Sequence, residues 1–94
     1  GLHSFFYPLL GPDDLQKLAL SMEDQFEGLL ALTAEKQLTV IIASAGDPHC
    51  GQLVRDYAPM YKGKGGGNPK LARAIFTKRE NLGLFLDLIE KHLR

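Results

Sequence analysis

The chain has 94 residues, of which 45% are hydrophobic and 23% charged, a composition typical of one soluble folded domain rather than a disordered or fibrous protein. Its 11 basic and 11 acidic residues cancel, which argues against nucleic-acid binding through bulk charge alone. Between residues 57 and 79, however, six basic residues occur without an acidic one. The single cysteine cannot form an internal disulfide, and no apolar run reaches the roughly 18 residues of a membrane-spanning helix. We therefore expect a cytoplasmic protein without a membrane partner.

The first quarter of the chain predicts a strand followed by a helix. His3–Tyr7 contains two adjacent aromatic residues and indicates a short strand. Before the helix, a glycine and a proline precede Asp13 and Asp14, which we expect to act as caps. The helix is expected from Asp13 to about Asp24, because apolar residues recur there at spacings of three and four. The residues in this apolar stripe are Leu15, Leu18, Ala19 and Met22.

Two apolar runs in the middle of the chain predict a β-hairpin. Gly28–Thr33 and Leu38–Ser44 are separated by the short loop 34–37, and the second run is rich in β-branched residues. Neither run alternates cleanly between apolar and polar positions. We therefore expect both strands to be covered on two faces.

The second half predicts a helix, a glycine-rich loop, a strand and a final helix. The first helix should run from His49 or Cys50 to Met60, and the stretch Lys62–Pro69, here called the glycine-rich segment, should form the loop. Leu71–Thr77 indicates a strand, and Glu80–Leu93 indicates a helix. The apolar side of that last helix is expected to contain Leu84, Leu88 and Ile89.

The glycine-rich segment is the strongest candidate for a binding site. Four glycines occupy five positions, Gly63 and Gly65–Gly67, and backbone amides free of Cβ atoms can converge on an anion. Lys62, Lys64 and Lys70 would add positive charge around a bound phosphate. The Walker and dinucleotide-binding patterns are absent. The alternative is a flexible, solvated connection.

Metal ligands and catalytic groups are not arranged in any recognisable motif. The candidates are His3, His49, Cys50 and His92, and none of the usual zinc spacings occurs among them. Cys50 beside His49 near a helix start could be an activated nucleophile, or it could be a small packing residue. We expect no catalytic residue, no metal and no cofactor in this domain.

Aromatic residues have two possible roles, packing and stacking on nucleic-acid bases. Tyr57 and Tyr61 flank the basic region and are the better candidates for contact with a base or ribose, with packing as the alternative. The five phenylalanines are expected in the core. They are Phe5, Phe6, Phe26, Phe76 and Phe85.

The motif at Gly63–Ala74 reads Gly-Lys-Gly-Gly-Gly-Asn-Pro-Lys-Leu-Ala-Arg-Ala. Together with the order of elements, it resembles the DHH-associated domain at the C-terminal end of alanyl-tRNA synthetases, of freestanding alanyl-tRNA editing proteins and of DHH phosphoesterases. Pro69 and Ala72 match the family pattern, whereas Arg73 stands in place of its glutamine and Asn68 in place of a basic residue or the histidine of phosphoesterases. The resemblance covers the chain from about Gly11 onward.

The resemblance implies one α/β (α+β) domain over residues 1–94, the C-terminal part of a larger protein. It implies a small mixed sheet with helices packed on it in one α/β layer pair, in the order β-α-β-β-α-(glycine-rich loop)-β-α. Its function would be to hold tRNA(Ala), or another nucleic acid, while another domain of an editing protein or synthetase does the chemistry. The implied contact residues are Lys62, Gly63, Lys64, Gly65, Gly66, Gly67, Asn68, Lys70 and Arg73.

Two further expectations concern the rest of such a protein. The chain lacks the His-x-x-x-His and Cys-x-x-x-His motifs of the editing domain, so any zinc would belong to a different domain. The alternatives to tRNA binding are the substrate-binding half of a DHH-type phosphoesterase and a dimerisation domain that forms a homodimer.

Overall fold

The structure, a computed structural model, describes residues 2–22 and 25–93. Its strands are β1 (Leu2–Tyr7), β2 (Leu29–Ala34), β3 (Thr39–Ala43), β4 (Lys64–Gly67) and β5 (Leu71–Ile75). Its helices are α1 (Pro12–Ser21), α2 (Cys50–Tyr57) and α3 (Arg79–His92), and a 3₁₀ turn, η1 (Ala58–Tyr61), follows α2. This confirms the mixed α/β fold with helices packed on a small sheet.

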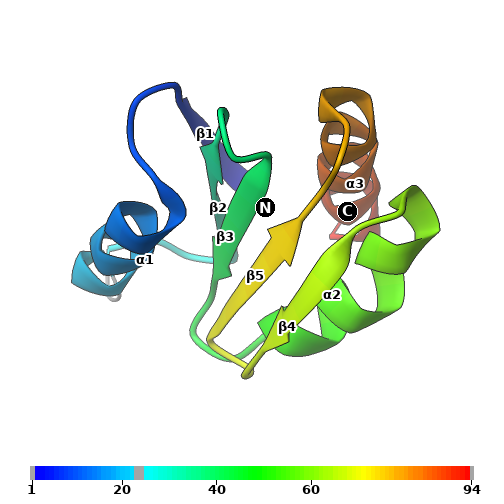
Figure 1. Ribbon diagram of the computed structural model, residues 1–94. Helices are drawn as coiled ribbons and strands as arrows, with labels where there is room; N and C mark the ends of the chain where they lie inside the picture. The colour runs from blue at the N-terminus through cyan, green and yellow to red at the C-terminus, as the bar shows by residue number, and fades with distance from the viewer. Residues whose placement is uncertain (1, 23–24, 94) are drawn as a thin grey trace.

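The strands of the described residues form a single five-stranded mixed sheet in the order β1-β2-β3-β5-β4. β1 is parallel to β2, and the other neighbouring strands are antiparallel. α1 lies on one face, and α2 and α3 lie on the other (Figure 1). The molecule therefore has three layers, where the resemblance implies two.

The central strands carry the core. Every residue of β2 and β3 is buried, which confirms that the hairpin is covered on two faces. One core cluster joins the sheet to α2 and α3 and contains Phe76 and Phe85; the other joins the sheet to α1 around Leu15. By contrast, Phe5 and Phe6 of β1 are about half exposed, so the expectation of a core position is wrong for these two. They lie on an edge strand that the helices leave partly uncovered.

The glycine-rich segment differs from the expected loop, because its central residues form the edge strand β4 and pair with β5. Glycine has low strand propensity, so pairing rather than local preference specifies this strand. α2 also ends earlier than expected, at Tyr57. Pro59 follows in η1, and Lys62 then adopts a left-handed conformation with φ 61°.

The ends and buried faces of the helices agree only in part with those expected from the sequence. Gly11 is the N-cap residue of α1 and the cap has no side-chain hydrogen bond, so the expected capping by Asp13 and Asp14 is wrong; both lie in the first turn. The expected end at Asp24 lies outside the described residues. In α3, Ile89 is buried as expected and Leu88 is half-buried, whereas Leu84 is exposed. Leu82, Phe85 and Leu86 complete the buried stripe. Within the described residues, no helix has the length and apolar character needed to cross a membrane.

Candidate nucleic-acid interface

Close packing explains two of the glycines in and around β4. A Cβ atom on Gly63 would overlap the ring of Phe76, and a Cβ atom on Gly67 would overlap Ala72 of the neighbouring strand. Gly51 of α2 is also required, because its Cβ atom would meet the backbone of Gly67. These three glycines allow α2 and β5 to lie directly against β4. Packing within the fold therefore explains why glycine occupies these three positions, without any role for a ligand.

Gly65 and Gly66 differ from each other in this respect. Gly65 has φ 151°, and a Cβ atom there would overlap the backbone carbonyl of Arg73. At Gly66, a Cβ atom would meet no atom of the described residues within 4 Å, and its φ lies outside the left-handed region. Gly66 is therefore the one glycine of β4 without a steric role in the described structure. A requirement for glycine there would come from close approach of a ligand.

β4 also presents backbone donors at the edge of the sheet. The N–H of Asn68 donates to the carbonyl of Leu71 at 2.9 Å, next to the pair formed by Gly67 and Ala72. Antiparallel pairs alternate between hydrogen-bonded and non-hydrogen-bonded positions. The N–H groups of Gly65 and Gly67 are consequently directed away from β5. Such groups can donate to a phosphate oxygen or to another strand.

Three lysines lie in β4 or next to it in the chain. Lys62 precedes β4, Lys64 begins it, and Lys70 lies in the turn to β5, and all three are exposed. Lys64 pairs with Ile75, so their side chains share the sheet face on which α1 lies. None of the three lysines forms a salt bridge within residues 2–22 and 25–93.

Arg73 is already engaged by neighbouring side chains. Its Nη2 donates to Oδ1 of Asp13 and to Oε1 of Gln16, both at 3.0 Å. Arg73 pairs with Gly66 across the two strands, so its side chain emerges on the same face as Lys64. The structure thus places Arg73 beside the lysines but holds its guanidinium toward α1. A phosphate could bind its remaining N–H donors or compete with Asp13.

Asn68 has a structural role in the turn between β4 and β5. Its Oδ1 accepts hydrogen bonds from the N–H groups of Lys70 and Leu71, both at 2.9 Å. This arrangement is typical of asparagine in tight turns. Asn68 therefore positions Lys70, and only its side-chain amide nitrogen remains available for a ligand.

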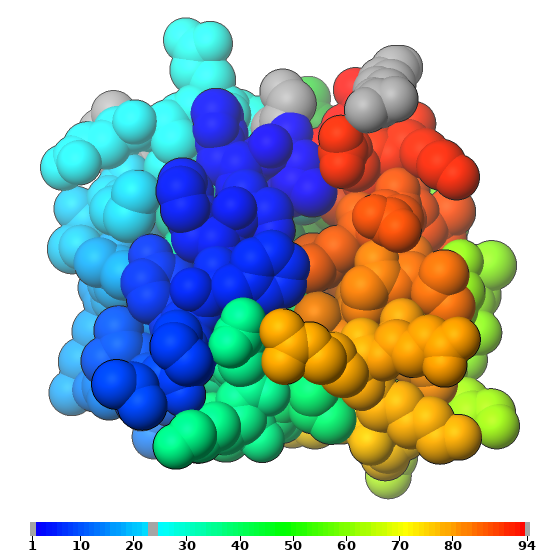
Figure 2. Space-filling model, turned by 90° about the horizontal axis from the view of Figure 1, so that it is seen from above, coloured from blue at the N-terminus to red at the C-terminus, as the bar shows by residue number. Residues whose placement is uncertain are grey.

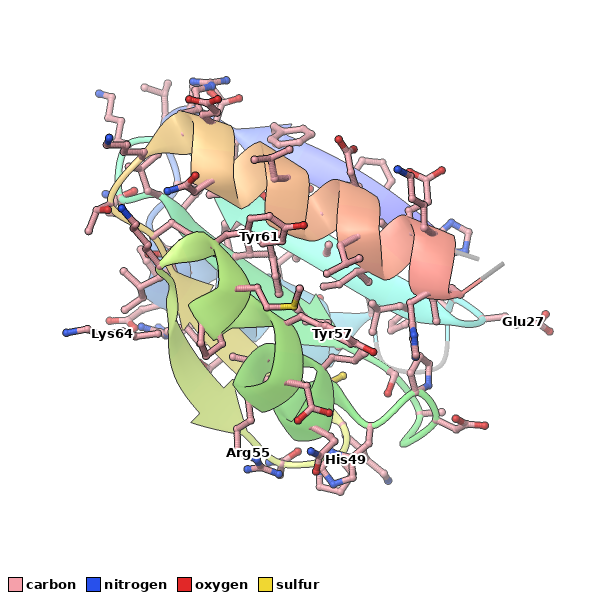
Figure 3. The ribbon with its side chains drawn as sticks, turned by 90° about the vertical axis from the view of Figure 1, so that its right-hand side faces the viewer. Glu27, His49, Arg55, Tyr57, Tyr61 and Lys64 are labelled. Atoms are coloured by element: carbon pink, nitrogen blue, oxygen red, sulfur yellow. The ribbon has the colours of Figure 1, made fainter. Side chains whose placement is uncertain are left out.

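Arg55 of α2 is a basic residue that our sequence analysis did not include. It lies one helical turn after Gly51, which packs against β4, and its side chain is exposed. Figure 3 shows Arg55 on the outer side of α2, near the end of β4. The spacing of four residues from Gly51 was visible in the sequence. The proximity of Arg55 to the glycine-rich segment depends on how α2 packs against β4, and the sequence did not show it.

The face of β4 and β5 on the α1 side is open. α1 contacts β2 and β3, which leaves Ile75 47% exposed beside Lys64. Next to this face, a pocket of about 230 Å³ lies between the end of α1 and the β4–β5 turn. It is lined by Ala19, Leu20, Phe26, Ala43, Ser44, Asn68, Lys70 and Leu71. The open face thus combines apolar surface with positive charge.

His49 and Cys50 have structural roles at the start of α2. Nδ1 of His49 accepts a hydrogen bond from the N–H of Gln52 at 3.1 Å, which caps the helix. Cys50 is buried, and its Sγ lies 3.4 Å from Oγ of Ser44. Desolvation by burial raises the pKa of the Cys50 thiol despite its hydrogen bond with Ser44. Activation of Cys50 as a nucleophile is therefore wrong, and the packing role is confirmed.

Tyr57 and Tyr61 lie on the side of the sheet opposite Lys64, where both point toward α3 (Figure 3). Both are partly buried against the core cluster of α2 and α3. The hydroxyl of Tyr57 lies 3.2 Å from Nδ1 of His92. The packing interpretation holds for these residues.

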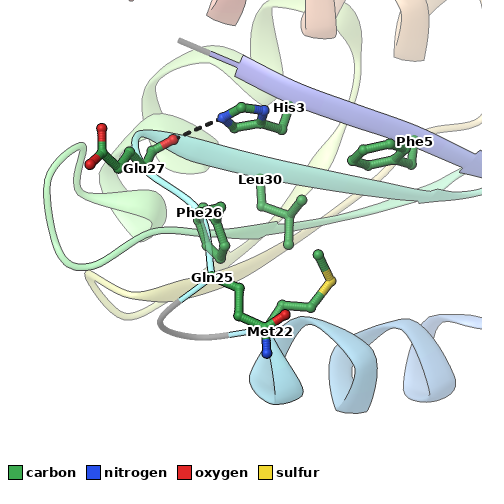
Figure 4. Close-up of a pocket in the computed structure, with 7 residues that line it drawn as sticks. All are labelled: His3, Phe5, Met22, Gln25, Phe26, Glu27 and Leu30. Atoms are coloured by element: carbon green, nitrogen blue, oxygen red, sulfur yellow. Dashed lines mark hydrogen bonds between the residues drawn. The ribbon is translucent and has the colours of Figure 1, made fainter.

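The largest pocket described lies away from the predicted site residues. It has a volume of about 580 Å³ and is formed between β1, the end of α1 and the segment before β2 (Figure 4). Nε2 of His3 lies 3.1 Å from the backbone carbonyl of Glu27 at its rim. Phe5, Met22 and Phe26 contribute apolar surface to its walls, and His3, Gln25 and Glu27 contribute polar surface. Neither lysine nor arginine occurs among the described residues that line it, so the pocket is a poor match for a phosphate.

Solved and curated proteins resemble this chain in sequence and fold. Alanine–tRNA ligases of Streptococcus pneumoniae strains Hungary19A-6, CGSP14 and D39 are each 31% identical over 61 residues, which is 65% of this chain and 7% of each ligase. The crystal structure of the C-Ala domain from Aquifex aeolicus alanyl-tRNA synthetase is 18% identical, with a TM-score of 0.78. That comparison covers 96% of this chain and 87% of the solved chain, so the two share a fold.

The match to a protein family extends over almost the whole chain. The family model of the DHHA1 domain matches residues 4–94, which include the glycine-rich segment, β5 and all three helices. This agrees with the resemblance carried by the motif at Gly63–Ala74. The chain belongs to the DHHA1 domain family.

Proposed function

We propose that this chain is an accessory domain that holds tRNA(Ala) for a larger, cytoplasmic alanyl-tRNA synthetase or alanyl-tRNA editing protein. The matched ligases are far longer than this chain, since the 61 matched residues make up only 7% of their length. Aminoacylation or hydrolysis would occur in another domain, and zinc required for editing would be bound there. The contribution of this domain would be affinity and placement of the RNA.

The observation that carries this proposal is the position of Gly66 beside Lys64 on an exposed edge strand. Packing explains the other glycines of β4, whereas Gly66 leaves open space on the face that also presents Lys64 and Arg73. A sugar-phosphate backbone could approach the strand closely at that point. Lysine and arginine contacts to phosphates orient a nucleic acid without reading its sequence.

A valine at Gly66 tests close approach without changing charge. The Gly66→Val variant should fold normally, because its Cβ position is free and valine favours strands. We expect at least roughly a 5-fold loss of affinity for tRNA(Ala), measured by fluorescence anisotropy, if the RNA backbone lies against β4. The matched control is Ser4→Val on the opposite edge strand, where Ser4 is also exposed. Equal affinities of both variants would exclude close approach at Gly66.

The two alternatives predict different outcomes. If the chain is the substrate-binding half of a phosphoesterase, it should bind dinucleotides, and the Gly66→Val variant should lose that binding. The histidine of the phosphoesterases is replaced here by Asn68, whose side-chain oxygen already accepts hydrogen bonds within the turn. If the chain is a dimerisation domain, it should self-associate, and the Gly66→Val variant should self-associate equally well. Sedimentation velocity and a dinucleotide titration on the same protein samples distinguish these functions from tRNA binding.

A further inference from the structure

The pocket between the end of α1 and the β4–β5 turn, here called the α1 pocket, adjoins the proposed RNA interface. Leu71 lines this pocket, and Arg73 lies two residues further along β5, so both side chains project from the same face of the sheet. Gly66 pairs with Arg73 across the two strands. The open space at Gly66 and the α1 pocket are therefore separated by only two residues of strand, or roughly 7 Å.

The lining of the α1 pocket is mostly apolar. Its apolar residues come from α1, from the segment before β2 and from two strands, and they are Ala19, Leu20, Phe26, Ala43 and Leu71. The hydroxyl of Ser44 is already engaged, since its Oγ donates to the carbonyl of Pro48 at 2.6 Å. The other polar side chains of the lining are those of Asn68 and Lys70, and both residues are exposed. An apolar cleft with a few polar groups is the usual form of a site for a small organic ring.

Lys70 joins the α1 pocket to the positive charge around β4. Its backbone N–H donates to Oδ1 of Asn68 at 2.9 Å, whereas its ammonium group forms no salt bridge within the described residues. Among those residues, no carboxylate lines the pocket. A phosphate bound by Lys70 would bring its attached sugar and base next to the apolar walls. The pocket and the lysine thus supply the two parts of a nucleotide site, an anion contact and an apolar cleft.

A pocket at the other end of the molecule lacks this combination. Figure 2 shows that end, where β1 (blue), the turn after β2 (green) and the start of α3 (orange) meet. The pocket there also has a volume of about 230 Å³, and its lining includes Phe6 and Gly83. Its arginine, Arg79, is paired with Glu35, with Nη2 and Oε1 3.3 Å apart. Because that carboxylate disfavours a phosphate, the α1 pocket is the better match for a nucleotide.

We propose that the α1 pocket takes one unpaired nucleobase of the RNA whose phosphates lie along β4. This inference rests on the proposed function, because it names the part of the RNA that the interface binds. Bases in a duplex are stacked and paired, whereas bases in loops, bulges and ends can be turned outward and enclosed by protein side chains. Leu20 and Phe26 supply apolar surface for such a base. The domain should therefore prefer RNA with an unpaired nucleotide over a continuous duplex.

Titration of the ¹⁵N-labelled chain with three small probes separates the base from the phosphate. The probes are adenosine 5′-monophosphate, ribose 5-phosphate, which lacks the base, and adenosine, which lacks the phosphate. We expect the nucleotide to bind with a Kd in the roughly millimolar range, at least about 3-fold more tightly than either other probe. Adenosine should shift the amide signals of Ala19 and Ala43, whereas ribose 5-phosphate should shift mainly those of Gly66 and Lys70. Unchanged signals of Ala19 and Ala43 with adenosine would overturn the proposal.

A shortened side chain in the pocket wall tests the contact with the base. Leu20 is 54% exposed, so the Leu20→Ala variant should fold normally. It should bind the nucleotide and adenosine about 3-fold or more weakly and bind ribose 5-phosphate unchanged. The matched control is Leu84→Ala, which removes an exposed leucine from α3 on the other face of the sheet. Equal affinities of the two variants for adenosine would mean that the base does not enter the α1 pocket.

Three RNA hairpins distinguish a base within RNA from a free nucleotide as the occupant. The first carries one bulged adenosine, the second has the same bulge without its base, and the third is fully paired. We expect the first to bind about 5-fold or more tightly than the second, and Leu20→Ala to remove that difference.

The hairpins also separate this proposal from the proposed function on which it rests. If all three bind equally well and Gly66→Val still weakens them, the base pocket is wrong while RNA contact at β4 stands. If no hairpin binds, the proposed function fails as well. Binding of adenosine 5′-monophosphate alone would then mean a site for free nucleotides, which also overturns the proposal.

Discussion

Adjacent glycines in β4 illustrate how residue-level geometry separates the requirements of the fold from those of a ligand. At Gly65, the backbone conformation and the carbonyl of Arg73 both exclude a side chain. At Gly66, neither restriction applies. The sequence shows three identical residues in a row, whereas the structure gives them different roles.

Alanine substitutions should therefore have opposite effects on stability at these two positions. Gly65→Ala should destabilise the domain by roughly 2 kcal/mol or more, because it combines strain with overlap. Gly66→Ala should be neutral or stabilise by up to about 1 kcal/mol, since it only reduces the freedom of the unfolded chain. Urea denaturation measures both values. Similar losses for both variants would contradict the backbone conformation described for β4.

The ion pair between Arg73 and Asp13 should limit RNA binding. Asp13→Asn would remove the carboxylate that holds the guanidinium, leaving Arg73 free to contact a phosphate. We expect a roughly 2- to 5-fold gain in tRNA affinity, with a salt dependence steeper by up to about one unit. Asp14→Asn removes the same charge from the same turn and controls for bulk electrostatics. Equal gains in both variants would show that Arg73 makes no specific contact.

Burial of Cys50 should make stability depend on alkaline pH. Because its folded-state pKa is raised above 9.0, the folded protein keeps the thiol neutral while the unfolded chain ionises. The stabilising contribution is fully present below about pH 9 and declines as pH rises past the unfolded pKa. Urea unfolding measures this decline as the fall in the free energy of unfolding between about pH 8 and pH 10. The fall should be smaller for the Cys50→Ala variant than for the unchanged chain. An identical pH dependence in the two proteins would contradict the raised pKa.

At the scale of elements, the sequence predicted those strands and helices whose side chains carry a clear pattern. The β-branched run of β3 and the stripe of α1 identified both elements, because apolar side chains drive their burial. β4 was missed because three of its four residues are glycines, so pairing with β5 and packing against α2, rather than a side-chain pattern, determine it. The face of α3 was misassigned because leucines occur on more than one side of that helix.

Gly83, which lies in the second turn of α3, gives a direct prediction for this helix. Gly83→Ala should raise stability by about 0.5–1 kcal/mol, since alanine favours the helix and the added methyl group meets open space. Thermal unfolding followed by circular dichroism measures the change. A loss of stability would mean that the space beside Phe6 is filled in solution.

For the whole molecule, the placement of helices decides which surfaces remain available. α1 covers β2 and β3, so the α1-side face of β4 and β5 stays open, and Lys64 and Arg73 project from it. The sequence pointed to the lysines around β4, because Lys62, Lys64 and Lys70 are close together in the chain. Arg55 and the contact between Arg73 and Asp13 could not be predicted, since both depend on packing between distant segments.

The most direct test of the proposed function is the salt dependence of tRNA(Ala) binding by a triple variant. Replacing Lys62, Lys64 and Lys70 with alanine should weaken binding and reduce the slope of log K against log salt by roughly 2–3 units, about one for each lost phosphate contact. The control variant replaces Lys17 and Lys36, which lie outside the basic region, and should retain nearly the full slope. A triple variant that binds tRNA(Ala) with the affinity and slope of the control would contradict RNA contact at the glycine-rich segment.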